Sequence, residues 1–303
     1  MKRTPIHKIS FLLLFLFVFG QIQANPVRKK SEFTRTYEKS YAISNHALLI
    51  LKHQFSNVEI INWNKNEVSI TVDITVTAKT ENRANEIFDK IIFDSDKSSN
   101  KVTVETYLKG NNNCSNSENF SIEVTIYAPA TISLDSEIEF GNFTLDTVNG
   151  ACNLEIQFGN VEAKKLTNTD NEISIEYGNF EVDELACKQF SVSFGNLEAE
   201  KVLFLEELDI SYGNAIIDRL DEACRDVEID ISFGSLELSL PSSGNYDMNI
   251  DSSFGDVDLS RDLNLISKEK DMFSASYRVT LGSGTNQITI DSSYSDVEID
   301  VDN

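Results

Sequence analysis

Carboxylate side chains recur four positions after a repeated aromatic residue. Ca²⁺ prefers oxygen ligands of this kind, and a row of them would also attract a basic ligand. A solvated acidic face, partly neutralised by Lys164, Lys165 and Lys201, is the more ordinary interpretation, and the calcium-binding Gly-Gly-x-Gly-x-Asp nonapeptide is absent from the sequence. The candidate ligand or cation face consists of Glu162, Glu181, Glu198, Glu237 and Asp258, extended by Glu59 and Glu298 and interrupted at Thr144 and Ile216.

The other residue types that carry catalysis are sparse. Beyond the first 24 residues the only histidines are His46 and His53, too few for a histidine-based metal cluster. The sequence holds no Gly-x-Ser-x-Gly elbow and no phosphate-binding glycine-rich loop, and Gly282-Ser283-Gly284 is typical of a turn. We therefore predict a protein that is not an enzyme, with no catalytic residue, no cofactor and no dedicated metal site.

The carboxylates belong to a sequence motif that repeats every 17–21 residues and consists of an aromatic residue, Gly, Asn and an apolar residue. An apolar residue stands two positions before the aromatic, as in Ile156 before Phe158 and Ile175 before Tyr177. Alternation with a period of two residues is typical of a β-strand, and it places both side chains on one face of the strand. We therefore expect the aromatic rings to face inward and to stack between neighbouring units, with the Asn side chains hydrogen-bonded in a ladder beside them.

Inward apolar residues follow the aromatic at odd offsets, so the backbone must bend at each Gly-Asn. Glycine, and next Asn, tolerate the positive φ that such a corner can require. The glycines predicted to form the repeat corners are Gly141, Gly159, Gly178, Gly195, Gly213, Gly234 and Gly255.

A unit of this length cannot bury its own apolar face, and a fixed period of about 20 residues indicates stacked units. The sequence predicts an all-β, single-stranded β-solenoid, similar to a β-helix or β-roll, with repeat units of about 17–21 residues. A β-sandwich is the alternative, but its hairpins favour Asn-Gly, whereas here the order is Gly-Asn.

The N-terminus resembles an export signal. Lys2, Arg3 and Lys8 precede an apolar run from Phe11 to Phe19, which is too short to span a bilayer. Cleavage after Ala24 would leave no transmembrane segment and an exported protein of the periplasm, cell surface or medium. The formal net charge of −23 over 303 residues argues against nucleic acid and anionic membranes as partners.

Three of the four cysteines, Cys152, Cys187 and Cys224, fall in every second repeat unit. Two strand spacings of about 4.8 Å would separate neighbours, whereas a disulfide needs Cα atoms within about 7 Å. We expect small, buried, unpaired core residues. Cys114, in a polar loop, is either free or paired.

The remaining chain divides by pattern. A signal peptide over 1–24 and a leader segment over 25–45 precede one domain over 46–303. Its part over 46–128 is irregular and has helical composition over 81–90, with Ala84, Ile87 and Phe88 on one face. A regular repeat array over 129–303 follows.

Several of these features resemble a family of exported bacterial proteins of unknown function, described as putative adhesins. They are the export signal, the stretch Val58-Glu59-Ile60-Ile61-Asn62-Trp63, the Pro129 that leads into the Gly-Asn repeats, and Gly282-Ser283-Gly284. The resemblance runs from about Ala47 to Asp302. It implies an adhesin-like, right-handed β-solenoid at the cell envelope, and it supplies no catalytic residues.

The function predicted from the sequence is accordingly an exported, non-enzymatic adhesin or ligand-binding protein of the envelope, with a surface glycan or protein as partner. The alternative is an envelope structural or stress-signalling accessory protein that binds another protein. A more remote alternative is a carbohydrate-active enzyme that uses facing acidic pairs.

Overall fold

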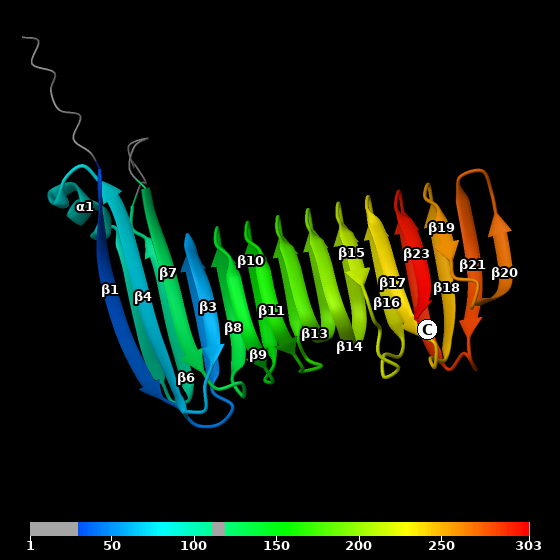
Figure 1. Cartoon of the computed structure of the whole chain (residues 1–303), viewed down its shortest axis with the longest axis horizontal. Coiled ribbons are helices and arrows are strands. Elements are labelled where there is room, and N and C mark those ends of the chain that lie inside the picture. Colours follow the sequence, from blue (N-terminus) through cyan, green and yellow to red (C-terminus); the bar gives the residue numbers. More distant parts are fainter. Residues whose placement is uncertain (1–29, 111–118, 303) are drawn as a thin grey trace, which may run out of the picture.

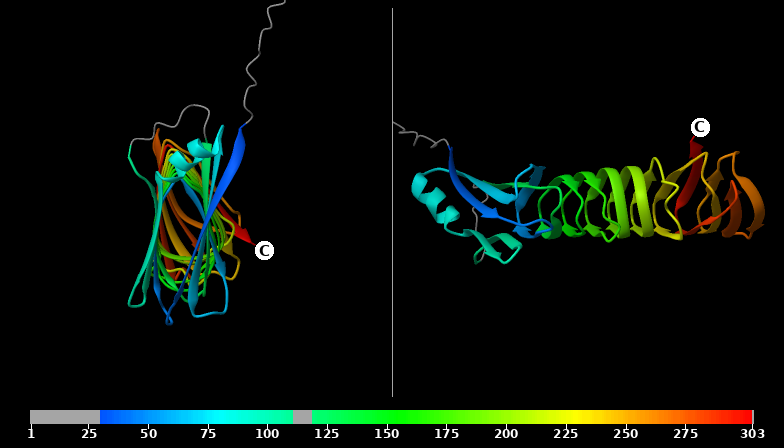
Figure 2. Two further views of the ribbon diagram at one scale, coloured as in Figure 1. Left: turned by 90° about the vertical axis from the view of Figure 1, so that its left-hand side faces the viewer. Right: turned by 90° about the horizontal axis from the view of Figure 1, so that it is seen from below.

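The computed structural model describes residues 30–110 and 119–302, and its 23 strands belong to one hydrogen-bonded sheet. The sheet doubles back on itself, so that two long layers enclose the core and the end-on outline is a flattened, nearly closed barrel (Figures 1 and 2). The expected signal peptide and Cys114 lie outside the described residues. Part of the expected leader segment forms the first strand, β1 (Ser31–Ala42).

The first layer runs the whole length of the molecule and carries the strands that follow each Gly corner. Its neighbours pair in parallel from β3 onward, and in antiparallel fashion at the end that contains β1. In spatial order it consists of β1, β4 (Glu67–Ala78), β7 (Asn119–Ala128), β3 (Ser56–Asn62), β9 (Phe143–Val148), β11 (Val161–Leu166), the first halves of β13 (Asn179–Ser193) and β14 (Asn196–Ser211), β15 (Asn214–Ile217), β17 (Ser235–Pro241), β23 (Asp296–Asp302) and β19 (Val257–Leu259).

The second layer faces the first and carries the strands that precede each corner. The long strands β13 and β14 continue from one layer into the other, which joins the two layers into one sheet. In spatial order the second layer consists of β5 (Ile91–Ser98), β6 (Lys101–Leu108), β2 (Leu48–Gln54), β8 (Ser133–Glu139), β10 (Cys152–Gln157), β12 (Glu172–Glu176), the second halves of β13 and β14, β16 (Val227–Ser232), β22 (Asn286–Ser293), β18 (Tyr246–Ser253), β21 (Ser274–Leu281) and β20 (Asn264–Lys270).

The predicted helix is confirmed as α1 (Glu81–Phe88). Thr80 caps its N-terminus by accepting a hydrogen bond from the backbone N–H of Arg83 (3.3 Å). Ala84, Ile87 and Phe88 are buried, and the helix packs against β4 and β1 at one end of the molecule.

The prediction of a single-stranded solenoid is wrong. The strand order is mixed, because the unit of β22 and β23 lies between that of β16 and β17 and that of β18 and β19. Likewise, β2 lies between β6 and β8, and β3 lies between β7 and β9, so each of these early strands pairs on both sides with strands that come later in the chain. Antiparallel pairs, such as β4 with β7 and β18 with β21, occur at both ends. The repeat makes every unit a compatible neighbour for every other, so sequence period alone does not fix their order.

Like residues nevertheless lie beside like residues across the parallel strands. In the second layer Ile138 pairs with Ile156, Ile156 with Ile175, and Ile175 with Val192. All four are buried, so the apolar side chains form continuous rows in the core. Cys152, Cys187 and Cys224 are buried and free, as predicted.

The backbone bends at each corner one residue earlier than expected. The repeated aromatics take φ of 52–58°, whereas none of the corner glycines has a positive φ. Glycine is needed there for a different reason, which is the close approach of neighbouring units. A Cβ atom on Gly178 would lie 1.8 Å from the carbonyl oxygen of Gly159.

Candidate functional site

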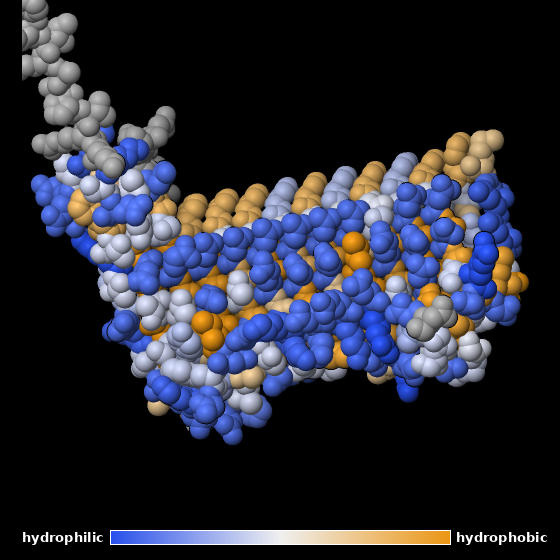
Figure 3. Space-filling view, viewed as in Figure 1, coloured by the Kyte–Doolittle hydropathy of each residue, from blue (hydrophilic) through white to orange (hydrophobic). Residues whose placement is uncertain are grey.

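The corners align their aromatic side chains into one row, which we call the aromatic ridge. Successive ring centroids lie 4.7–5.2 Å apart, and all pairs but the last are within 2–7° of parallel. Figure 3 shows the ridge as a continuous line of apolar and weakly polar residues along the upper edge of the molecule. In spatial order it comprises Phe55, Phe140, Phe158, Tyr177, Phe194, Tyr212, Phe233, Tyr294, Phe254 and Phe273.

The ridge side chains are stacked, as expected, but the expectation that they face inward is wrong. Their exposed fractions run from 37% for Phe55 to 60% for Phe273. The positive φ of the aromatic residue interrupts the alternation, so Ile156 points into the core while Phe158, two residues later, points out. Counting alternate residues along the sequence could not reveal this outward orientation, because the count assumes an unbroken extended backbone.

A row of side-chain amides runs beside the ridge, which we call the asparagine ladder. Asn142 Oδ1 accepts hydrogen bonds from the backbone N–H (3.1 Å) and the side-chain amide (3.4 Å) of Asn160. Asn160 Oδ1 accepts the same two bonds from Asn179, at 3.1 and 3.2 Å. The pattern continues to Asn196 and Asn214, which confirms the ladder predicted from the sequence. These bonds fix the corners relative to one another and hold the rings in line.

The predicted acidic residues form an exposed row on the first layer. Strand register places Glu162 beside Glu181 and Glu181 beside Glu198. Further along, Ile216 separates Glu198 from Glu237, and Glu298 separates Glu237 from Asp258.

No group of three or more His, Cys, Asp or Glu side chains in the described residues is placed to hold a metal ion. A ligand or cation role for the acidic row therefore stays a prediction.

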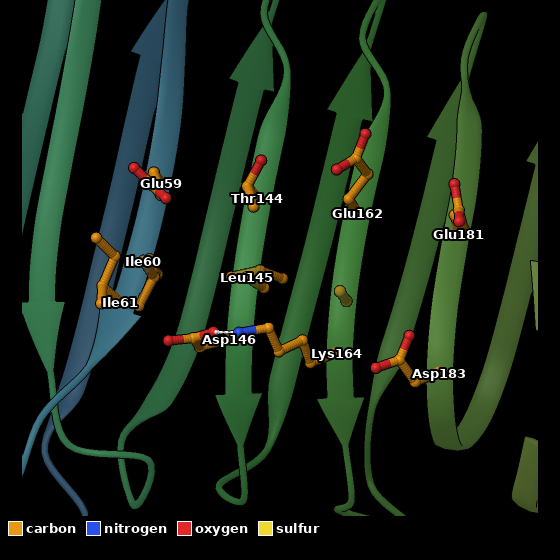
Figure 4. Close-up of a pocket in the computed structure, with 11 residues that line it drawn as sticks. Glu59, Ile60, Ile61, Thr144, Leu145, Asp146, Glu162, Lys164, Glu181 and Asp183 are labelled. Atoms are coloured by element: carbon orange, nitrogen blue, oxygen red, sulfur yellow. Dashed lines mark hydrogen bonds and ion pairs between the residues drawn. The ribbon is translucent and has the colours of Figure 1, made fainter.

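A hollow of about 420 Å³ opens on the first layer beside this row. Figure 4 shows Glu59, Thr144, Glu162 and Glu181 along one side of it, and the ion pair of Asp146 with Lys164 along the other. The backbone N–H of Asn62 also donates to Asp146, at 2.9 Å.

Asp146 and Lys164 shift each other's pKa in this hollow. Partial burial would raise the pKa of Asp146, but hydrogen bonds from Lys164 and Asn62, with the lysine charge, lower it overall. The hydrogen bond and charge of Asp146 raise the pKa of Lys164. Both Asp146 and Lys164 therefore stay ionised at neutral pH.

One buried polar cluster was not singled out from the sequence. His53 lies inside the second layer, where its Nδ1 is 2.8 Å from the Thr106 hydroxyl, and Thr106 is 2.7 Å from the Ser56 hydroxyl. Burial lowers the pKa of His53 to about 3, so the ring is neutral. Ser56 Oγ also donates to the backbone carbonyl of Gln54 (3.1 Å), and the cluster lies in the core beneath the start of the ridge, where His53 and Thr106 line one side of a hollow of about 210 Å³.

Within residues 30–110 and 119–302, no helix combines the length and apolar character needed to cross a bilayer.

Comparison with known proteins returns likeness to solved structures only. The chain matches no protein-family model and no curated protein. A putative cell adhesion protein from Clostridium sporogenes is 14% identical, with 90% of this chain and 100% of that chain covered and a TM-score of 0.24. A putative adhesin from Bacteroides fragilis is 12% identical (88% and 97% covered, TM-score 0.34). A putative lipid binding protein from Parabacteroides distasonis is 12% identical (87% and 96% covered, TM-score 0.31).

Proposed function

We propose that this chain is a non-enzymatic binding protein exported to the cell envelope, and that it binds its ligand along the aromatic ridge. The observation that carries the proposal is the unbroken exposure of ten stacked aromatic side chains at one edge of the molecule. Export rests on the N-terminal sequence described above, and an adhesive role agrees with the family resemblance found there.

The backbone does not require aromatic residues at these positions. Nine of the ten ridge residues hold a positive φ, at which a bulky side chain costs about 1–2 kcal/mol relative to glycine. Stacking returns about 0.5–1.5 kcal/mol per pair, so strain and stacking roughly cancel. Folding stability alone therefore gives little reason to place half-exposed rings here, whereas a contact surface does.

Ring geometry favours a protein over a glycan as the partner. Each internal ring has a neighbour over both faces, at 4.8 Å in the middle of the ridge, so only ring edges are free. A sugar that stacks on an aromatic needs an open face. Ring edges instead suit side-chain contacts with aromatic or aliphatic residues of another protein, and the exposed asparagine ladder adds hydrogen-bonding groups alongside.

The experiment compares the wild type with a ridge variant, Phe158→Asn/Tyr177→Asn/Phe194→Asn. Asparagine tolerates positive φ, so the backbone of the corners is preserved while the rings are removed. Tyr107→Asn is the matched control, because Tyr107 is 42% exposed and lies outside the ridge. Circular dichroism and thermal melting establish that each variant is folded.

Binding is measured to immobilised envelope proteins from the producing cell, to a glycan array and to neutral phospholipid vesicles. We expect saturable binding to a protein that the ridge variant loses at least tenfold and Tyr107→Asn retains. Binding only to glycans or only to vesicles would contradict the protein partner, and equal binding by the folded ridge variant would remove the ridge from the function.

A further inference from the structure

The two ends of the molecule are built differently. At the end that contains β1, helix α1 covers the layer, and the Arg35 guanidinium lies 4.5 Å from the centre of the Phe88 ring and 3.3 Å from Asp89. At the other end, the first layer stops at the three-residue strand β19, while the second layer continues through β21 and β20 (Figure 1). The second layer therefore overhangs the first by two strands.

The overhang exposes apolar side chains. All seven residues of β20 are exposed, and Leu265 and Ile266 are 51% and 54% exposed. In the turn after β20, Met272 is 84% and Phe273 60% exposed. A hollow of about 310 Å³ beside the turn is lined by Phe254, Met272, Phe273 and Tyr277 among others. Exposed apolar surface of this kind at the end of a repeat array indicates an interface, because stacked arrays need polar caps to remain soluble.

Both strands at this end have a free edge in the described structure. β19 pairs only with β23, and β20 pairs only with β21. The two edges carry opposite charge. β19 itself carries one acidic residue, Asp258, with Asp256, Arg261 and Asp262 around it, whereas β20 carries Lys268 and Lys270 with Glu269, and Asp271 follows it. Within the strands themselves, β20 has a net charge of +1 and β19 of −1, so the two edges are complementary in charge.

We propose that two copies of this chain associate end to end, with β20 of each copy added to the free edge of β19 of the other. The step formed by a short first layer and a long second layer is self-complementary under a twofold axis parallel to the strands. Each first layer then continues into the partner's second layer, and the two overhangs face each other across a shared core. The inner faces of the two overhanging pairs of strands are covered by each other in this arrangement.

Strand direction agrees with the pairing. Strands of the two layers run in opposite directions, as the arrowheads in Figure 4 show, and β20 runs parallel to β18 because each is antiparallel to β21. A twofold axis along the strands preserves their directions, so β20 meets the partner's β19 in antiparallel fashion. The same axis keeps both aromatic ridges on one edge of the dimer, where they meet near Phe273.

Charge reversal tests the pairing directly. The first variant, Lys268→Glu/Lys270→Glu, opposes like charges at both copies of the edge contact. The second, Asp256→Lys/Asp258→Lys, does so with the opposite sign. All four residues are exposed, so the second variant should keep the wild-type melting temperature within about 2 °C. The first variant also loses the contact of Lys268 with the Tyr277 ring, 4.6 Å from its centre, which is a weak interaction at the surface, and it should stay fully folded. Lys52→Glu/Lys188→Glu is the matched control, with the same change in charge away from this end.

Sedimentation velocity and light scattering measure the mass of the purified protein. We expect a dimer for the wild type and the control, a monomer or at least tenfold weaker dimer for each reversed variant, and a restored dimer when the two reversed variants are mixed. A wild type that is monomeric at 100 μM, about a hundred times a micromolar Kd, would overturn the proposal. So would a dimer that both reversals leave intact, or a mixture that fails to re-form one. None of these outcomes depends on the ridge ligand.

Discussion

Replacing Gly178 with alanine tests the account of the corners most directly. The added Cβ would lie 1.8 Å from the carbonyl oxygen and 2.8 Å from the carbonyl carbon of Gly159. Ordinary contacts for such atoms begin near 3.4 Å, and the obstacle is backbone rather than a flexible side chain. The two units must therefore separate by about 1–1.5 Å at this corner.

Separation on that scale breaks the local hydrogen bonds. The backbone N–H of Phe158 donates to the carbonyl of Glu176 (2.9 Å), and Asn179 donates twice to Asn160 Oδ1 (3.1 and 3.2 Å). Three bonds at about 0.5–1.5 kcal/mol each, added to about 1–3 kcal/mol of overpacking, predict a loss of about 2.5–7.5 kcal/mol in the free energy of unfolding.

Urea unfolding, followed by circular dichroism, measures the loss, and amide hydrogen exchange locates it. Gly110→Ala is the control, because its Cβ would meet nothing within 4 Å and its φ of +87° costs only about 1 kcal/mol. Exchange should increase most between residues 158 and 197, in the units that share the corner. If Gly178→Ala costs no more than Gly110→Ala, close approach is not the reason for the repeated glycine.

Two further predictions follow from burial. Phe180 is fully buried and packs edge-on against Phe190 with 5.0 Å between ring centroids, so Phe180→Ala should lower the free energy of unfolding in urea by about 3–5 kcal/mol. Tyr177 is 46% exposed, so Tyr177→Ala should lower it by only about 1–2 kcal/mol. Equal losses would contradict the outward placement of the ridge. Because the pKa of His53 falls from 6.5 to about 3 on folding, protonation favours the unfolded chain, and stability should fall between pH 6.5 and 3 by up to about 1.4 kcal/mol per unit. His53→Gln should lose that part of the slope, and unfolding curves at pH 6 and 4.5 that shift equally in both proteins would refute it.

Local pattern predicted much of the structure because its causes are local. Period-two alternation around Ile156 and Ile175 identified strands and the buried face correctly, since each strand has one face in the core. Composition and spacing of apolar residues identified α1. The arithmetic of strand spacing correctly separated Cys152 from Cys187. Each of these inferences uses information within one unit or between adjacent ones.

The order of the units could not be predicted in the same way. The last copy of the repeated motif, Tyr294-Ser295-Asp296-Val297, has diverged in sequence, and its Tyr294 ring stacks between Phe233 and Phe254 rather than after both. Its Ser295 takes the place of the corner glycine, and a Cβ on Gly255 would lie 1.8 Å from the Ser295 carbonyl, much as at other corners. The close backbone contact at the corners is therefore available in either order. The order of the last two units instead depends on the long connection between them, which contains β20 and β21 and whose length the repeat period does not encode.

The candidate site was missed for a related reason. The carboxylates on the first layer draw attention because their type suggests chemistry, and the aromatics are assigned to the core because counting alternate residues places them on the same face as the apolar residue two positions earlier. A single positive φ at Phe158, repeated in its neighbours, reverses that assignment for the whole row. The residue type that could reveal it is the glycine that follows: a close contact between backbones at Gly159 leaves no room for a ring on the inner side of the corner, so the ring before it must turn out. The same contact that makes glycine necessary therefore makes the ridge exposed, and a repeat of aromatic-Gly-Asn is better interpreted as a surface edge than as a core.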